Sequence, residues 1–172
     1  MKTIYKSNEV SKQIKNELKA AFKDVKFSVR YQSYSGGDNI NISWDLGCTE
    51  SDVKKIVDKY QTASYNSMED IKEYNPQLVV DKNGEISKLG GVDYIFTSRN
   101  CDDVFVNVLE DVRILLSNDL KINDYEIRNY VSKLLLITTF PKDFVYKNVE
   151  RITEKDYYDV NNPLHLKIVF GN

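Results

Sequence analysis

Residues 26–46 read KFSVRYQSYSGGDNINISWDL, two alternating runs on either side of a turn-forming segment. Every second position of each run is apolar: Phe27, Val29 and Tyr31, then Ile40, Ile42, Trp44 and Leu46. A period of two is typical of strands that bury one face. Residues 35–39 (Ser-Gly-Gly-Asp-Asn) combine residue types that favour tight turns. The segment therefore predicts an antiparallel hairpin with one apolar face.

Helical patterns flank this hairpin on both sides. Ser7 is a candidate cap for a helix that runs to about Phe22. Five apolar residues recur in it at helical spacing: Val10, Ile14, Leu18, Ala21 and Phe22. After the hairpin, Thr49 is a good cap for a second helix whose first turn is acidic. Because both helices are amphipathic, we expect each to bury one stripe against the strands.

Further strands are expected at residues 78–80 and 92–99, and Asn-Gly at 83–84 is a strong hairpin signal. Within residues 62–76, the spacing of three apolar residues predicts a short helical turn: Met68, Ile71 and Tyr74. Consecutive strands of this kind form antiparallel sheets. The fold class predicted for residues 1–100 is α+β, with a four-stranded antiparallel sheet and two helices on one face.

The remaining sequence is more helical. Residues 102–116 show a long apolar stripe, Asn123 is a candidate cap for a further helix, and residues 164–170 alternate like a strand. Residues 101–172 are therefore expected to form a helical extension with a C-terminal strand. We expect this extension to pack as one unit with residues 1–100.

The composition is that of a globular protein of one domain's size. Of 172 residues, 41% are hydrophobic and 29% are charged. No apolar run approaches the ~20 residues of a membrane span, and no secretory signal is recognisable at the N-terminus. These features predict a cytoplasmic protein without a membrane partner. Cys48 and Cys101 lack a metal-binding spacing, so we expect reduced thiols, with a disulfide or redox pair as the alternative.

Charge is distributed unevenly along the chain. Residues 1–30 hold eight basic and three acidic residues, a net charge of +5, whereas residues 101–172 hold nine and twelve, a net charge of −3. Four lysines form a narrow stripe opposite the apolar face of the first helix: Lys12, Lys15, Lys19 and Lys23. The stripe fits a solvated outer face, and it fits a footprint for RNA, DNA or an acidic protein surface. Arg30 and Tyr34 are candidates to extend this partner-binding patch, because Arg and Tyr are frequent at interface hot spots.

No catalytic constellation emerges from the sequence. The single histidine, His165, lies in the expected terminal strand and is interpreted as a strand residue, not a catalytic base. The Gly-rich runs at residues 35–38 and 90–91 lead into strands and lack the phosphate-loop pattern. We therefore expect no catalysis, cofactor, metal or small-molecule substrate. A metal-dependent nuclease that gathers carboxylates from several elements is the alternative.

The hairpin carries motifs that resemble a known family. Residues 27–30 (Phe-Ser-Val-Arg), 33–37 (Ser-Tyr-Ser-Gly-Gly), 40–44 (Ile-Asn-Ile-Ser-Trp) and 47–49 (Gly-Cys-Thr) are similar to the pattern of the large polyvalent protein-associated domain of phages and mobile elements. The similarity continues through two further segments, residues 65–70 and 92–99. It covers about the first hundred residues in all. Cys48 stands where the family pattern has Pro, which leaves the conformation of that turn open.

The resemblance implies a mobile-element protein that acts against host defences, and it supplies no catalytic residues. Together with the acidic helical segment, it resembles a small anti-CRISPR protein directed at a type II effector nuclease. The leading hypothesis is stoichiometric inhibition of a host CRISPR effector nuclease or its guide RNA complex. The basic helix would contact guide RNA or an acidic patch, and the acidic second half would mimic DNA or dock on a basic surface. The alternative is a nucleic-acid-binding accessory module of a mobile element.

Overall fold

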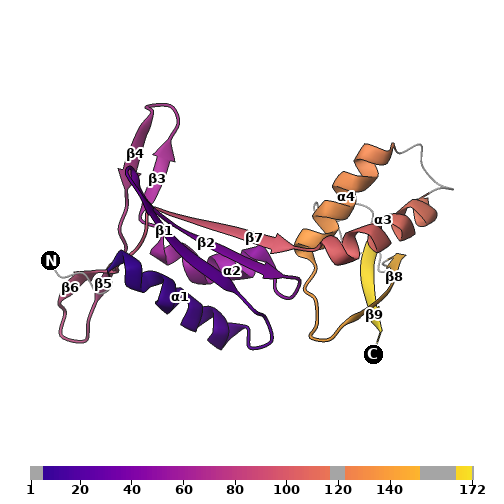
Figure 1. Ribbon diagram of the computed structural model, residues 1–172, viewed down its shortest axis with the longest axis horizontal. Helices are drawn as coiled ribbons and strands as arrows, with labels where there is room; N and C mark the ends of the chain where they lie inside the picture. The colour runs from indigo at the N-terminus through magenta and orange to yellow at the C-terminus, as the bar shows by residue number, and fades with distance from the viewer. Residues whose placement is uncertain (1–5, 117–122, 152–165, 172) are drawn as a thin grey trace. The chain divides into compact units, whose positions relative to one another are not determined.

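The structure is a computed structural model that describes three ranges of the chain: residues 6–116, 123–151 and 166–171. It divides into two compact units, residues 1–45 with 50–99, and residues 46–49 with 100–172 (Figure 1). Helices and strands occur in both, which confirms the α+β class. The expectation that the two regions pack as one unit stays a prediction.

The first unit begins with α1. Its elements in chain order are α1 (Ser7–Ala21), β1 (Ser28–Tyr34), β2 (Gly37–Asp45), α2 (Glu50–Val57), the 3₁₀ turn η1 (Asp58–Tyr60), β3 (Ala63–Asn66), β4 (Ile71–Tyr74), β5 (Leu78–Val80), β6 (Ile86–Lys88) and β7 (Tyr94–Asn100). Ser7, expected as the cap of α1, is instead its first residue. Lys6 takes the cap position, and its backbone N–H donates to the Glu9 carboxylate at 3.1 Å.

β1 and β2 form the hairpin that the sequence predicts. They pair antiparallel from Ser28 opposite Ser43 to Tyr34 opposite Gly37. The inward side chains of β2 are almost fully buried: Ile40, Ile42 and Trp44. Most of the apolar stripe of each helix is buried as well: Val10, Ile14 and Leu18 of α1, and Val53 and Val57 of α2. At the end of the stripe predicted for α1, Phe22 is partly buried and Ala21 is exposed. The two helices contact each other and cover this one face of the sheet, and no helix in the described part of the first unit covers the other face.

The third strand of this sheet is β7, and it lies beside β2. At one end, the backbone N–H of Asp38 donates to the carboxylate of Asp93, which directly precedes β7. At the other end, the N–H of Leu46 donates to the carbonyl of Asn100. The contacts advance in the same sense along both segments, so β2 and β7 run parallel. A parallel neighbour requires a long crossover connection, which α2 and the hairpins after it provide.

The predicted four-stranded antiparallel sheet is therefore wrong in detail. Residues 78–80 do form a strand, β5, but it pairs with β6 around the Asn-Gly turn at 83–84 and forms a hairpin of its own. Residues 62–76 contain another hairpin, β3 with β4, and not the predicted helical turn. Its three apolar residues are exposed and form no buried stripe that would stabilise a helix: Met68, Ile71 and Tyr74. Spacing by three across a turn thus imitated a helical period.

The second unit contains α3 (Asp102–Leu116), α4 (Asp124–Ile137), β8 (Val145–Arg151) and β9 (Leu166–Gly171). The apolar stripes predicted for both helices are buried in a single core, and β8 pairs with β9 against it. Asn123 caps α4 as predicted, because its side chain accepts from the N–H of Glu126 at 2.9 Å. Three aromatic rings close the core with centroids 5.1–5.6 Å apart: Phe140, Phe144 and Phe170. The strand predicted at 164–170 is confirmed in its described part, and His165 lies outside the described residues.

Glu17 joins α1 to η1 within the first unit. Its carboxylate accepts hydrogen bonds from the Tyr60 hydroxyl at 2.7 Å and the Gln13 amide at 3.1 Å, and it lies 2.7 Å from the Lys59 ammonium. Burial acts to raise the pKa of Glu17, but hydrogen bonds from Lys59, Tyr60 and Gln13 outweigh it and lower this pKa below its ordinary value of 4.5. The folded chain therefore favours the charged carboxylate.

We predict that the stabilisation from Glu17 is lost in acid. A carboxylate whose pKa is lowered on folding stabilises the protein above its unfolded pKa, and this contribution disappears as pH falls through the folded pKa. Glu17→Gln should therefore lower the urea midpoint at pH 7, and its difference from wild type should shrink below about pH 4. Tyr60→Phe should move the loss to higher pH, because one donor to the carboxylate is gone. A difference between wild type and Glu17→Gln that stays constant with pH would contradict this assignment.

Candidate binding surface

The uncovered face of the three-stranded sheet is the candidate binding surface, and we call it the outward face. In β1 and β2 it carries the residues that alternate with the buried ones, with Arg30 opposite Asn41 and Gln32 opposite Asn39. In β7 it carries Tyr94, Phe96, Ser98 and Asn100. Two of the outward side chains on the three strands are charged, Arg30 and Asp45. The others are uncharged: Ser28, Gln32, Tyr34, Asn39, Asn41, Ser43, Tyr94, Phe96, Ser98 and Asn100. Asp45 is the last residue of β2.

Aromatic rings and amides share this face. The rings of Tyr94 and Phe96 lie with centroids 6.3 Å apart and planes inclined by 21°. Phe96 is 53% exposed and Tyr34 is 49% exposed, although large rings of this kind are ordinarily buried. Beside them, the side-chain Nδ2 of Asn41 donates to Gln32 Oε1 at 3.2 Å and to Asn39 Oδ1 at 2.9 Å. The face therefore presents stacking surfaces next to an ordered row of hydrogen-bonding groups.

Lys72 connects the β3–β4 hairpin to the edge of this face. Its ammonium lies 5.0 Å from the ring centroid of Tyr74 and 5.5 Å from that of Tyr94, within range of cation–π attraction. It also pairs with the carboxylate of Asp93 and donates to the carbonyl of Gly36 at 3.3 Å. The hydrogen bond to Asp93 raises the pKa of Lys72 above its ordinary value. The lysine therefore stays charged and orders two rings around itself.

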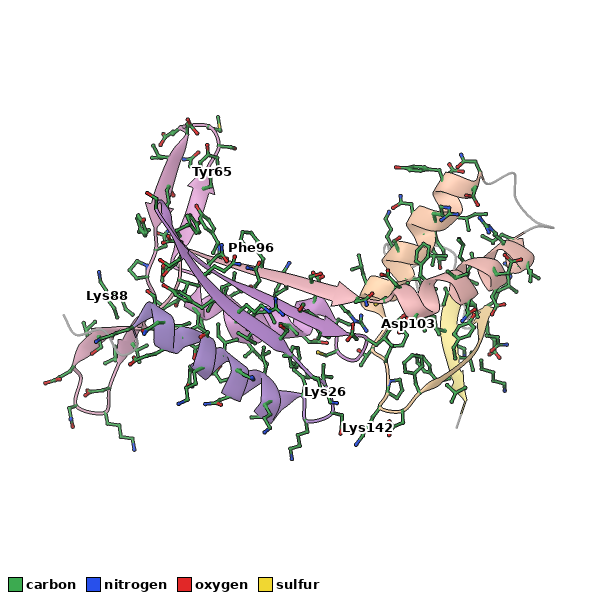
Figure 2. The ribbon with its side chains drawn as sticks, in the orientation of Figure 1. Lys26, Tyr65, Lys88, Phe96, Asp103 and Lys142 are labelled. Carbon is green, nitrogen blue, oxygen red and sulfur yellow. The ribbon has the colours of Figure 1, made fainter. Side chains whose placement is uncertain are left out.

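The hairpin adds a further exposed ring. Tyr65 stands directly opposite Lys72 in the register of β3 and β4, and it is 57% exposed. Its hydroxyl donates to the carboxylate of Asp70, and this bond raises the pKa of the Tyr65 phenol. Figure 2 shows Tyr65 on the hairpin and Phe96 on β7.

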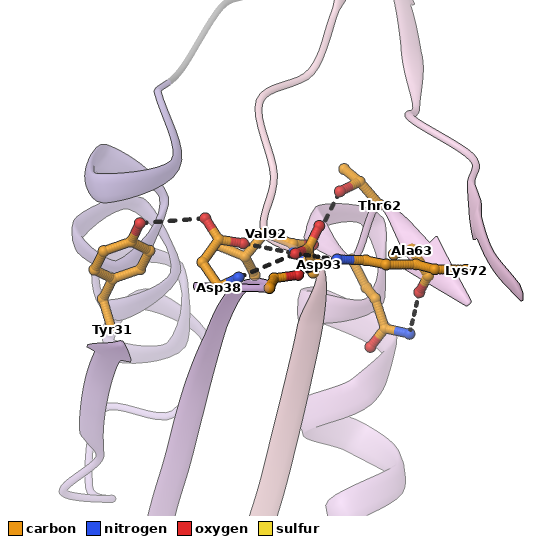
Figure 3. A network of polar contacts seen from close by, with 9 residues as sticks. Tyr31, Asp38, Thr62, Ala63, Lys72, Val92 and Asp93 are labelled. Atoms are coloured by element: carbon orange, nitrogen blue, oxygen red, sulfur yellow. Dashed lines mark hydrogen bonds and ion pairs between the residues drawn. The ribbon is translucent and has the colours of Figure 1, made fainter. Parts of the chain in front are cut away.

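A polar network fixes the end of the sheet at which these groups meet (Figure 3). Asp38 and Asp93 bond reciprocally: the N–H of Asp38 donates to Asp93 Oδ2 at 3.0 Å, and the N–H of Asp93 donates to Asp38 Oδ1 at 2.8 Å. The Tyr31 hydroxyl donates to Asp38 Oδ2 at 3.2 Å. Asp93 is only 8% exposed, so the Lys72 ammonium compensates a charge that would otherwise be costly to bury.

Two glycines make room for this arrangement. A Cβ on Gly37 would lie 2.0 Å from Asp93 Oδ2 and 2.8 Å from Lys72 Nζ, and its φ of 152° also disfavours other residues. A Cβ on Gly91 would lie 2.4 Å from the carbonyl oxygen of Tyr60. At this point residues 60–63 form backbone hydrogen bonds with residues 92–93. Both glycines therefore permit close approach of chain segments, and neither belongs to a phosphate loop.

The structure separates the partner-binding residues that the sequence predicts. Lys12, Lys15 and Lys19 are exposed on the side of α1 that points away from the sheet, and Lys23 is exposed just after the helix ends. Arg30 and Tyr34 lie on the outward face, whereas α1 covers the inward face. The lysines and the hairpin residues thus belong to two surfaces on opposite sides of the sheet, because strand alternation directs Arg30 away from the helix.

Sequence reasoning missed the other members of the surface. Tyr94 and Phe96 carry a readable signal, since they alternate with Ile95 and Thr97 in a strand that was predicted. Lys72 carried no such signal, because its segment imitated a helical turn. The role of Asp93 depends on Asp38, which is 55 residues away, and no local pattern reveals that partner.

Neither a metal cluster nor a disulfide marks a chemical site in the described ranges. Among residues 6–116, 123–151 and 166–171, no three or more His, Cys, Asp or Glu side chains gather as metal ligands would. Cys48 is buried, Cys101 is partly buried, and neither forms a disulfide within the described residues. Of the helices that the structure describes, none is both long and apolar enough to cross a bilayer.

Comparison with known families supports what the hairpin motifs indicate. The model of the large polyvalent protein associated domain 29 matches residues 5–103, more than half of the chain. The chain belongs to this family, which is associated with phages and mobile elements. No curated protein and no solved structure matches it. The matched range contains both segments that meet at Asp38 and Asp93.

We predict that Gly37 and Gly36 respond differently to the same substitution. Gly37→Ala should lower the free energy of unfolding by about 2–4 kcal/mol, because the new methyl overlaps the Asp93 carboxylate in a strained backbone conformation. Gly36→Ala is the matched control: its Cβ would meet only the Tyr34 ring at 3.8 Å, so it should change stability by less than about 1 kcal/mol. Urea unfolding measures both. Equal effects of the two substitutions would argue against a packed junction at Asp93.

Proposed function

We propose that this protein is a non-catalytic binding protein of mobile elements, which inhibits a host type II CRISPR effector nuclease by stoichiometric binding. The observation that supports it is the outward face, which leaves Tyr34, Phe96 and Arg30 exposed beside ordered amides. Aromatic residues and Arg are enriched where proteins bind macromolecules. The choice of a CRISPR nuclease rests on the mobile-element family and is an argument by association.

Inhibition by masking fits the form of this surface. The Asp38–Asp93 network holds one end of the three-stranded sheet in place. Binding to a partner would therefore cost little conformational freedom of side chains and loops. Tyr and Arg side chains on a rigid support give contact area at low entropic cost. Such an inhibitor consumes no substrate and needs no cofactor. It would act in the cytoplasm of the infected or carrier cell, where the nuclease is found.

The acidic second unit is a weaker candidate for the contact. Its described acids are partly neutralised by neighbours: Arg113 pairs with Asp124 and Glu110, and Arg128 pairs with Asp124 at 2.9 Å. The Arg113 guanidinium, followed by that of Arg128, lowers the pKa of Asp124. A mimic of DNA would present unpaired negative charges in a regular row. The geometry therefore favours the first unit as the binding part.

The lysines of α1 favour a second candidate function, a nucleic-acid-binding accessory module. Three of them share one exposed side of the helix, and no acidic side chain within the described residues forms an ion pair with them: Lys12, Lys15 and Lys19. When a row of cations on a helix binds phosphates, the counterions condensed on the nucleic acid are released, and this release favours binding. The same stripe fits guide RNA in an inhibited nuclease complex, so both functions would use it.

We predict equimolar inhibition of a guide-loaded type II effector nuclease. Plasmid cleavage should fall in proportion to added protein and end near one equivalent, because masking requires one inhibitor for each nuclease. Arg30→Ala with Tyr34→Ala should weaken inhibition at least about tenfold, as expected for hot-spot residues. Tyr125→Ala is the control, since Tyr125 is 77% exposed on α4 of the second unit. Inactivation of many nucleases by one inhibitor would show catalysis instead and would end this proposal.

We further predict that the lysine stripe governs salt dependence. Changing Lys12, Lys15, Lys19 and Lys23 to Glu should abolish binding to nucleic acid or to the guide-loaded complex at 150 mM salt, because phosphate contacts are lost. Any affinity that remains at lower salt should depend less steeply on the salt concentration. A variant with the same charge change elsewhere is the control, built on four other exposed lysines: Lys82, Lys88, Lys133 and Lys147. Equal losses in both variants would point to net charge alone and not to a surface on α1.

A further inference from the structure

We propose that the outward face binds single-stranded nucleic acid, with bases stacked on Tyr94 and Phe96 and a phosphate held by Arg30. This inference goes beyond inhibition of a nuclease, because it assigns a ligand class to the sheet face whichever complex the protein enters. It also differs from binding by the lysine stripe, which lies on the other side of the sheet.

The two rings have the spacing that successive bases need. Residues two apart on a strand are separated by about 6.6 Å, and the centroids of Tyr94 and Phe96 are 6.3 Å apart with nearly parallel planes. An extended single strand can place one base on each ring, and base–aromatic stacking tolerates any sequence. Lys72 holds the Tyr94 ring through a cation–π contact, which keeps the platform ordered without a ligand.

A row across the sheet supplies the polar contacts. In the β1–β2 register Arg30 stands opposite Asn41, and β7 with Phe96 lies on the other side of β2. Asn41 uses its amide nitrogen for both of its hydrogen bonds, to Gln32 and Asn39. Its carbonyl oxygen accepts none from the described residues, so it can accept from the edge of a base. Single-stranded bases are read in this way, by stacking together with hydrogen bonds to their edges.

Arg30 supplies a cation for a phosphate at the middle of this face. Arg30 is exposed and forms no ion pair within the described residues, and Asp45 is the other charged side chain of the outward face. The centre of this face is a row of amides, which can form hydrogen bonds to the edges of unpaired bases. Asp45 lies four residues along β2 from Asn41, the register partner of Arg30, so it is not beside a phosphate held at Arg30. The face of a sheet can contact unpaired bases, whereas the major groove of a duplex admits a helix or a two-stranded ribbon. A single strand is therefore a better ligand for this face than a duplex.

The test is binding of fluorescein-labelled 12-nucleotide oligo(dT) and oligo(U) to the full chain, followed by fluorescence anisotropy. A hairpin duplex of equal length serves as the competing ligand. We expect the single strands to bind more tightly than the duplex. Phe96→Ala should weaken binding about 5- to 100-fold, in line with the loss of one stacked base. Arg30→Gln should weaken it and reduce the slope of log affinity against log salt by about one.

Matched variants keep the result interpretable. Phe96→Leu retains apolar volume and removes only the ring, so it should also weaken binding if stacking is the cause, even where Phe96→Ala disturbs folding. Tyr125→Ala removes an exposed ring of the second unit and should leave the affinity unchanged. Unfolding by urea confirms that each variant is folded.

Three outcomes would overturn the proposal. The first is absence of oligonucleotide binding at tens of micromolar protein. The second is binding that survives Phe96→Leu and Arg30→Gln but is lost with the α1 lysines. The third is loss of nuclease capture in the Phe96 variants without any oligonucleotide binding, which would make the face a protein interface. Oligonucleotide binding without nuclease inhibition would support this inference and refute the proposed function, so the two can fail separately.

Discussion

The reciprocal hydrogen bonds between Asp38 and Asp93 hold together segments that lie 55 residues apart. A carboxylate as buried as that of Asp93 destabilises a fold unless it is paired and hydrogen-bonded. The Lys72 ammonium and the Asp38 N–H meet that requirement, and Gly37 leaves the space in which they do so. The turn between β1 and β2, the start of β7 and the β3–β4 hairpin are thereby fixed to one another.

This junction gives the motifs of the family a structural meaning. The motif at residues 33–37 contains Gly37, and the motif at residues 92–99 contains Asp93. Both lie at this contact and within the matched range, residues 5–103. Their glycines and aspartates therefore describe a scaffold, and a ligand is not required to explain them. Function has to be sought in the side chains that the scaffold orients outward, among them Phe96 and Arg30.

Local pattern was sufficient to predict the elements whose burial follows a clear period. Val10, Ile14 and Leu18 marked α1, the alternation around Ile42 marked the hairpin, and the stripe of α3 and α4 identified the core of the second unit. Strand partners were another matter, because pairing of β7 with β2 depends on contacts between distant residues and on the crossover through α2. The hairpin at residues 63–74 was missed because Ile71 and Tyr74 are exposed, so its formation leaves no buried stripe to read. The sequence indicated Arg30 and Tyr34 as binding residues, but it placed them in one patch with the lysines of α1. The alternation of side chains along β1 instead directs both residues to the opposite face of the sheet.

Two surfaces on opposite sides of one thin sheet limit what a partner can do. The lysines of α1 and the rings of β7 are separated by the buried layer that contains Ile42 and Leu18, so a single flat surface cannot touch both. A partner that used both would have to reach around the unit or consist of two components. The guide-loaded nuclease that we propose as the target would be a partner of this kind, because it would offer protein surface and nucleic acid together. The separation of charge from aromatic rings is thus more easily reconciled with a ribonucleoprotein complex than with an isolated duplex, whose phosphates would engage the lysines and leave the sheet unused.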